Sequence, residues 1–554
     1  MRLTDSAATK LEHYFLDIKF APLALSAISE LLAEVLKEAP PPAEEMEGEL
    51  AAAFLERLIP LVQTAIIKKQ QAYGAVQWLW YLRRMPEFPL MGSYHTTLAY
   101  DLALAESLSW YCPQTGASPS GNPLAFNCDE SVARHLARFI GRIKLLSQLH
   151  IAYRRVGKGS RLTVSSKEVR FHTDAATEAA INLYDERHDA ARQHNGGRLG
   201  IAEGNTDFTD PEHFSEPDIA RAHLVFGFHG DKIDAPTLFP HEGRLVAGLV
   251  ATRFILQSAS VDRIIRPFLA GNGPTPAYVQ QLSALVLLLI LLPSLFVEFP
   301  WAFSTVQQRG YFLTMGAQLR AWADKNLEHV ARQLSERYPE IVWPGKYDDW
   351  INSLNSIEPN LWPLKSGGVL RKLGEITLID FSAATSSLLA GQQIDRDPAI
   401  GNVRAGIFED ECQEIIDASS WVPPDALKQQ RRKQLRRNGN KITDVDAVGC
   451  RDGQLLLVSC KSLVYDGDYD KGVLRVVKNL QSTIDKAVAD WNAKIEDIRN
   501  NPRGDNFDFS GYREIHGVVC TPFVAYSNTA ATLQRSIFGW HACASAEELR
   551  NALA

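Results

Sequence analysis

Three polar residues near the carboxyl end of the chain, Asp446, Ser459 and Lys461, stand where a buried hairpin is expected to bring them together. A carboxylate binds hard divalent cations, and a lysine beside it stabilises negative charge that develops during a reaction. Lys461 ends an apolar stretch, and the stretch before it carries two carboxylates, Asp444 and Asp446. The pattern therefore indicates a site for metal-assisted chemistry. The alternative is a lysine that simply emerges into solvent where its strand ends.

The elements that would position these residues are two strands and a turn. Residues 442–448 alternate, so a strand here would place Asp444 and Asp446 on the same face. An Asp-Gly pair at 452–453 between apolar runs predicts a tight hairpin turn. Residues 454–461 are apolar on both faces, which predicts a strand in the centre of a sheet.

This hairpin resembles the PD-(D/E)xK nuclease superfamily, which has the restriction-endonuclease-like fold. In that family an Asp on one strand and a Glu-x-Lys on the next bind a divalent metal and position the attacking water. Asp446 matches the family Asp, and Lys461 matches the Lys. The chain departs from the motif at Ser459, which stands at the Glu position. The resemblance covers residues 401–554 and implies a metal-dependent nuclease that uses Mg²⁺ or Mn²⁺.

The serine leaves two alternatives open, because a hydroxyl is a poor ligand for a hard dication. In some restriction enzymes of this fold a serine occupies this position and a carboxylate from elsewhere fills the gap. Here that carboxylate would be Asp444, or Glu409 on the preceding helix in a Gly-x-Phe-Glu context similar to the family's. The resemblance further implies a metal ligand in the backbone carbonyl of Cys460. Alternatively the site has decayed, and the domain only binds nucleic acid or a partner.

Nucleic acid, with double-stranded DNA favoured, is the partner that the resemblance implies. Residues 428–441 contain seven basic side chains and no acid, a composition suited to a phosphate backbone, although a solvated basic segment has the same composition. The residues expected to contact nucleic acid are Arg431, Arg432, Lys433, Arg436, Arg437, Lys441 and, on the next long helix, Lys478 and Gln481.

The whole chain is expected to be a multidomain α+β protein. Residues 1–160 predict a helical domain, residues 161–400 a mixed region, and residues 401–554 a nuclease-like α/β domain with a central mixed sheet. In this last part we expect helices at 404–418 and 473–498, each with an apolar stripe, and strands at 515–520 and 537–541. A capping box of Ser545 and Glu548 predicts the start of a terminal helix. A large region ahead of a nuclease is similar to bacterial defence or DNA-processing effectors, in which it senses or assembles. We therefore expect a homo-oligomer or a partner subunit bound through that region.

Composition restricts the partners and the cellular location expected for the protein. A net charge of −7 gives no global nucleic-acid signature, so any such binding must be local. The seven cysteines include no CxxC pair and the N-terminus has no apolar signal core, so we expect reduced thiols and a cytoplasmic protein. Residues 282–297 are almost wholly apolar; we favour a buried core helix, and a membrane-associated effector is the alternative.

Overall fold

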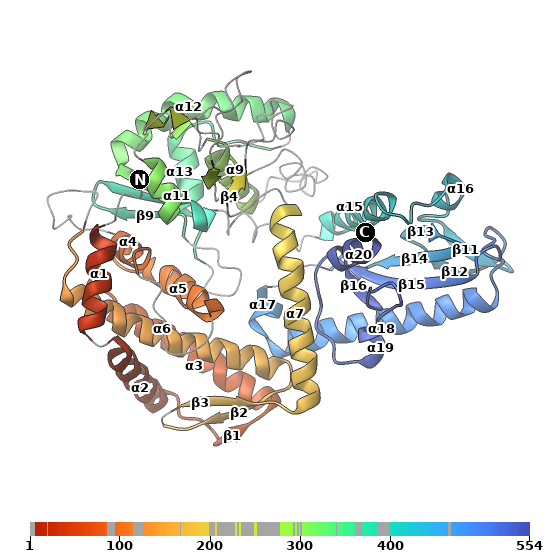
Figure 1. Ribbon diagram of the computed structural model, residues 1–554, viewed down its shortest axis with the longest axis horizontal. Coiled ribbons are helices and arrows are strands. Elements are labelled where there is room, and N and C mark those ends of the chain that lie inside the picture. Colours follow the sequence, from red (N-terminus) through yellow and green to blue (C-terminus); the bar gives the residue numbers. More distant parts are fainter. Residues whose placement is uncertain are drawn as a thin grey trace. The chain divides into compact units, whose positions relative to one another are not determined.

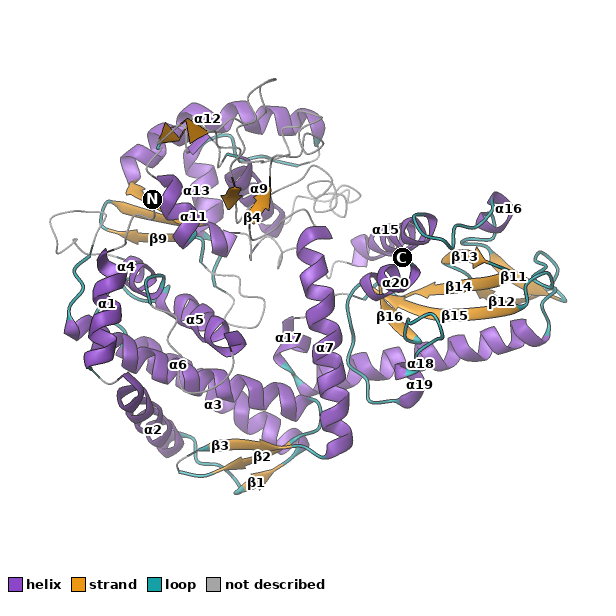
Figure 2. Cartoon of the chain, in the orientation of Figure 1, coloured by secondary structure: helices purple, strands orange, loops and turns teal. Residues whose placement is uncertain are grey.

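The computed structural model of the chain describes residues 6–18, 20–85, 95–114, 126–166, 168–198, 205–207, 228–229, 232–233, 249–251, 277–291, 294–295, 298–299, 302–339, 341–359, 368–384, 387, 398–463 and 467–554. The chain is a mixed helix and sheet protein (Figures 1 and 2). It forms two compact units. The first comprises Met1–Val156, Arg161–His172 and Leu199–Gln393, and the second Gly157–Ser160, Thr173–Arg198 and Ile394–Ala554. The sequence predicts a boundary near residue 400, and the second unit adds Gly157–Ser160 and Thr173–Arg198 to the chain beyond that boundary.

The first unit is mainly helical, as residues 1–160 predict, and its later part adds the strands expected of a mixed region. Its helices are α1 (Ser6–Asp17), α2 (Phe20–Glu38), α3 (Gly48–Lys69), α4 (Ala75–Leu82), α5 (His95–Ser109), α6 (Glu130–Gly157, whose last residue belongs to the second unit), α9 (Ala277–Ile290), α11 (Ala302–Arg309), α12 (Gly316–Arg337) and α13 (Tyr347–Asn355). Its strands are β1 (Glu45–Met46), β2 (Arg161–Val164), β3 (Val169–His172), β4 (Asn205–Asp207), β5 (Phe228–His229), β6 (Lys232–Ile233), β7 (Leu249–Ala251), β8 (Tyr311–Met315), β9 (Leu370–Leu373) and β10 (Ile376–Asp380).

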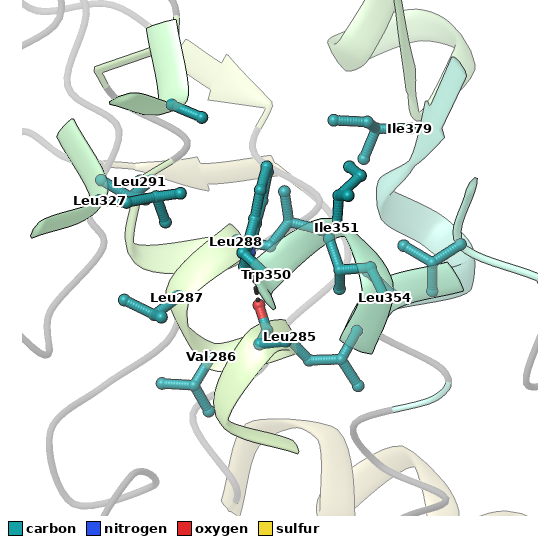
Figure 3. Close-up of a cluster of buried hydrophobic side chains, with 14 of the residues drawn as sticks. Leu285, Val286, Leu287, Leu288, Leu291, Leu327, Trp350, Ile351, Leu354 and Ile379 are labelled. Atoms are coloured by element: carbon teal, nitrogen blue, oxygen red, sulfur yellow. Dashed lines mark hydrogen bonds between the residues drawn. The ribbon is translucent and has the colours of Figure 1, made fainter. Parts of the chain in front are cut away.

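The apolar run at 282–297 contributes to the core of this unit. Leu285, Leu287 and Leu288 of α9 are buried in one cluster with Trp350 of α13 (Figure 3). The Trp350 indole N–H donates to the carbonyl of Ala284 at 3.2 Å, which satisfies its polar atom inside the cluster. Among the described residues one helix, α3, is long and apolar enough to cross a membrane, a test that core helices of water-soluble proteins also pass.

The second unit contains the expected hairpin. Its elements are α7 (Ala175–Arg198), α15 (Pro398–Asp417), α16 (Asp425–Lys428), β11 (Gln434–Arg437), β12 (Asn440–Asp444), β13 (Ala447–Arg451), β14 (Gln454–Cys460), α17 (Gly467–Lys471), α18 (Leu474–Asn500), β15 (Glu514–Thr521), α19 (Ala530–Leu533), β16 (Cys543–Ser545) and α20 (Ala546–Leu553). Strands β13 and β14 are antiparallel, and β14, β15 and β16 run parallel in the order β13-β14-β15-β16. Strand β14 is therefore central, as its apolar faces predict.

Helices cover both faces of this sheet (Figure 1). Helix α18 packs on one face through one buried cluster, and α15 and α20 pack on the other through a second. Two glycines permit the close approach. A Cβ on Gly517 would lie 2.4 Å from Ile495 of α18, and one on Gly449 would lie 2.8 Å from Ile416 of α15. The amphipathic stripes read from the sequence therefore face the sheet as predicted.

Local turn and cap chemistry follows the sequence. The Asp-Gly turn is confirmed, because Asp452 and Gly453 take φ values of 48° and 76° and β13 pairs directly with β14. The terminal helix is confirmed too, and its capping box joins Ser545 and Glu548.

Two strand predictions are wrong. Residues 442–448 do not form one strand: β12 ends at Asp444 in a two-stranded sheet with β11, and β13 begins at Ala447 in the four-stranded sheet. A bend thus separates residues that alternation had placed on one face. The run at 537–541 belongs to a turn closed by a bridge between Arg535 and His541, and the last strand is β16.

Helix α7, distant in sequence, belongs to the second unit and protects its edge strand. The Arg187 guanidinium pairs with the Glu548 carboxylate at 2.6 Å and donates to the carbonyl of Cys543 on β16 at 2.9 Å. Edge strands expose unpaired backbone groups, so this contact satisfies one of them. Only 8% of the Arg187 side chain is exposed, which makes the pair a buried one.

We predict that Arg187→Ala destabilises the second unit by about 3 kcal/mol, because it leaves the Glu548 carboxylate buried without its partner. Urea unfolding followed by tryptophan fluorescence measures the change. The matched control is Arg503→Ala, whose pair with Asp508 is exposed, and its effect should be below about 0.5 kcal/mol. Equal effects of the two substitutions would contradict the assignment of α7 to this unit.

Candidate functional site

The candidate site lies at the carboxyl ends of the parallel strands β14 and β15, where sites commonly form in such sheets. Asp446 continues the pairing of β13 beyond its first residue, since its N–H donates to the Val458 carbonyl at 3.0 Å. Its carboxylate Oδ2 accepts from the Cys460 N–H at 2.6 Å. Lys461 extends β14 in turn, because its N–H donates to the Cys520 carbonyl at 2.8 Å. The hairpin therefore brings Asp446, Cys460 and Lys461 together, as the sequence predicts.

Burial governs the charge of Asp446. Desolvation raises the pKa of the Asp446 carboxyl group to about 6, against the lowering effect of its hydrogen bond from Cys460. The Glu409 carboxylate raises this pKa further, and the Lys461 ammonium group lowers it. Raised carboxyl pKa values of this kind are typical of functional sites, although structural ion networks also produce them.

The side chains at the end of β14 alternate between the two faces of the sheet. Leu455 and Leu457 belong to the cluster under α18, whereas Leu456 and Val458 face α15 and α20. By the same alternation Ser459 and Lys461 lie on the α18 side. Ser459 is 7% exposed, so a hydroxyl occupies a buried position at which the resemblance implies a carboxylate.

The Cys460 thiol points the other way, and only the backbone of Cys460 serves the site. A hydrogen bond with Cys412, together with burial, raises the pKa of the Cys460 thiol well above its usual value. Cys412 also lies 3.6 Å from Cys520, sulfur to sulfur. All seven cysteines are present as thiols and not as disulfides. A neutral thiol packed in this way behaves as a small apolar group and is a poor nucleophile.

Glu409 comes from α15, on the face of the sheet that the Cys460 thiol also faces, and its charge raises the pKa of both the Asp446 carboxyl group and the Cys460 thiol. Its carboxylate is bound by Arg432 at 2.6 Å. The neighbouring Asp410 pairs with Arg431 and, at 3.3 Å, with Arg432. Burial raises the pKa of Asp410, but the hydrogen bonds and charges of the two arginines outweigh this and lower it.

Asp444, the other candidate carboxylate, is held differently. It lies at the end of β12, is exposed, and pairs with Lys441 at 3.5 Å. The charge of Asp444 also raises the pKa of Asp446, but by less than burial or the charge of Glu409 does. The expectation that Asp444 and Asp446 share one strand face is wrong because the chain bends between them, so Glu409 is the better-placed second carboxylate.

The predicted nucleic-acid contacts separate into groups. Arg431 and Arg432 pair with the α15 acids at the site, and Arg431 also donates to the Asp446 carbonyl at 3.0 Å. Arg437 pairs with Asp497 of α18 at 2.9 Å, and Lys441 with Asp444. The remaining two basic residues, Lys433 and Arg436, are exposed.

On α18, Lys478 is exposed and Gln481 donates to Asn528 at 2.7 Å. The nearby Asp485 accepts from the hydroxyls of Ser527, Thr529 and Thr532 and so anchors the segment before and within α19. This flank of α18 therefore binds the segment at residues 527–532. No hydrogen bond or ion pair of the described residues joins it to Asp446.

The sequence patterns do not predict the contacts of two supporting residues. Asp410 joins Arg431 and Arg432 to α15. The Gln413 amide pairs with both backbone groups of Val448, at 2.9 and 3.0 Å, and so ties α15 to the edge strand β13. The sequence carries no local signal for either contact, since the partners lie 21 and 35 residues away.

The donors suit a hard dication in chemistry. Asp446 and Glu409 repel each other, the Cys460 N–H contacts the Asp446 carboxylate, and Mg²⁺ is commonly bound by one or two carboxylates with water as the other ligands. Within the described ranges, no three His, Cys, Asp or Glu side chains gather in a way that would hold a metal. The fit therefore depends on two carboxylates, of which Glu409 is bound to Arg432.

Comparisons with known proteins add no relative. No family model matches the chain, and no curated protein or solved structure is significantly similar to it.

We predict that Asp446→Asn stabilises the protein above pH 6 by on the order of 2 kcal/mol, because it removes a charge that burial disfavours while keeping the acceptor for Cys460. The folded-state pKa lies above the unfolded value, so ionisation of Asp446 lowers stability as pH rises through this range. The gain should therefore shrink as pH falls and vanish below about pH 4.

Urea denaturation between pH 4 and 8 measures this dependence. The exposed Asp490 on α18 gives the control Asp490→Asn, which should show no comparable gain. A gain at Asp446 that does not change with pH would contradict a desolvated carboxyl group.

Proposed function

We propose that the second unit is a restriction-endonuclease-like domain and that the protein is a metal-dependent nuclease acting on DNA. The observation that carries the proposal is the placement of Asp446. Its carboxylate is desolvated, held by the Cys460 N–H and influenced by both Lys461 and Glu409. A carboxylate, a lysine and a second carboxylate at one end of a strand pair suit phosphodiester hydrolysis better than a purely structural role.

The chain's own residues would divide the work as follows. Asp446 and Glu409 would supply anionic oxygens, and the Cys460 carbonyl would add a neutral one. Lys461 would orient the attacking water and stabilise charge on the phosphate. Mg²⁺ or Mn²⁺, when bound, supplies Lewis acidity and lowers the pKa of a coordinated water.

The substrate side of the proposal depends on exposed positive charge. Lys433 and Arg436 are exposed, and Arg432 has a side chain that is 44% exposed beside the carboxylates. These cations would contact phosphates near the site.

A cytoplasmic location agrees with the reduced thiols. A defence or DNA-processing role, in which the first unit would sense or assemble, is an architectural analogy.

A second candidate function is a catalytically silent module that binds nucleic acid or a partner. The observation that favours it is Ser459, whose buried hydroxyl stands in place of the motif carboxylate. The paired state of Glu409 adds to it, because a carboxylate bound to Arg432 is less available to a metal.

We predict that the wild-type protein cleaves DNA when Mg²⁺ or Mn²⁺ is present and that Lys461→Ala lowers the rate by about 100-fold or more, through lost stabilisation of developing charge. Gel assays with duplex DNA, single-stranded DNA and RNA, each with metal and with EDTA, measure the effect. The control is Lys486→Ala, an exposed lysine on α18, which should cleave at the wild-type rate. Absence of cleavage of all three substrates, or an unimpaired Lys461→Ala variant, would refute catalysis at this site.

We further predict that Ser459→Glu leaves metal affinity within about threefold of wild type, because Glu409 already supplies the second carboxylate. Isothermal titration with Mn²⁺ measures the affinity, and Ser459→Gln controls for side-chain size without charge. A decayed site would behave differently: the new carboxylate would create binding that the wild-type protein lacks.

A further inference from the structure

Arg432 adopts an unusual backbone conformation. Its φ of 61° lies in the left-handed region, which costs free energy for a side chain other than glycine. Its N–H donates to the Val445 carbonyl at 2.7 Å, so the turn is fixed against the bend that carries Asp446. The Arg432 guanidinium also donates to the Gly406 carbonyl on α15, which shows that the turn directs the side chain onto that helix.

The guanidinium group neutralises the second carboxylate of the site. Arg432 Nε lies 2.6 Å from Glu409 Oε2, and a further nitrogen lies 3.3 Å from Asp410. The Arg432 side chain is 44% exposed, whereas that of Glu409 is 21% exposed, so the cation covers the carboxylate from the solvent side. Arg432 therefore provides positive charge where Glu409 and Asp446 would otherwise repel each other.

The neighbouring arginine has a different role. Arg431 is 19% exposed, donates to the Asp446 carbonyl and pairs with Asp410. It can hold the turn against α15 without any contribution from the pair between Arg432 and Glu409. Exposed ion pairs are weak, so Arg432 is the partner that a competing cation displaces at low cost.

We propose that Arg432 serves as a built-in counter-cation that holds Glu409 until a divalent cation displaces it. This inference rests on the proposed function, because it requires a dication to bind between Glu409 and Asp446. Displacement would couple two events: Glu409 turns to the metal, and a guanidinium still tethered by Asp410 becomes available beside the site.

The test is Mn²⁺ affinity, measured by isothermal titration and by electron paramagnetic resonance of free Mn²⁺ on the full chain. Arg432→Gln and Arg432→Gly each remove the competing charge, and we expect each to bind Mn²⁺ about three- to tenfold more tightly than wild type. Glycine also suits the positive φ, so this variant protects the test against loss of folding. The control Arg475→Gln removes an exposed arginine from α18 and should leave the affinity unchanged.

Three results would overturn the inference. Unchanged or weaker binding in both Arg432 variants, with binding by wild type intact, refutes the competition but leaves the proposed function standing. An equal gain in Arg475→Gln reduces the effect to general charge and also refutes it. No Mn²⁺ binding by any variant refutes the metal site itself, and with it both proposals.

Discussion

The hydrogen bond from the Cys460 N–H to the Asp446 carboxylate is the contact on which the candidate site depends. It joins the start of β13 to the end of β14 and holds the desolvated Asp446 carboxylate near both strands and α15. The rest of the second unit makes this arrangement possible: α18 and α15 enclose the sheet, glycines let both helices approach, and Gln413 ties α15 to the edge strand. A buried carboxylate with a raised pKa lowers stability at neutral pH, so Asp446 reduces the free energy of unfolding in this position.

In the basic segment at residues 428–441, ion pairs formed on folding determine how much positive charge stays exposed. Seven basic residues without an acid suggest an open phosphate-binding strip. Folding instead pairs most of them with acids from other elements: α15 contributes Glu409, Asp410 and Asp417, and α18 contributes Asp497. The positive charge left exposed is smaller and more local than the sequence indicates. This local charge is consistent with the net negative charge of the whole chain.

Sequence patterns predicted the features that short-range rules determine. The Asp-Gly turn, the central apolar strand and the capping box at Ser545 each follow from residues next to one another. The bend after Asp444 was missed because alternation continues through it, and only the separate pairing of β12 with β11 breaks the strand. The membership of α7 and the pairing of Arg432 with Glu409 depend on contacts between distant segments, which periodicity does not encode.

The proposed nuclease site requires a divalent cation between Asp446 and the end of β14. A crystal of the protein soaked in Mn²⁺ tests it through the anomalous difference map at the manganese edge. We predict a peak about 2 Å from an Asp446 carboxylate oxygen, with the Cys460 carbonyl and Glu409 turned toward it and Arg432 moved away. A map without a peak at this position, in crystals that diffract well enough to show ordered water, would contradict it.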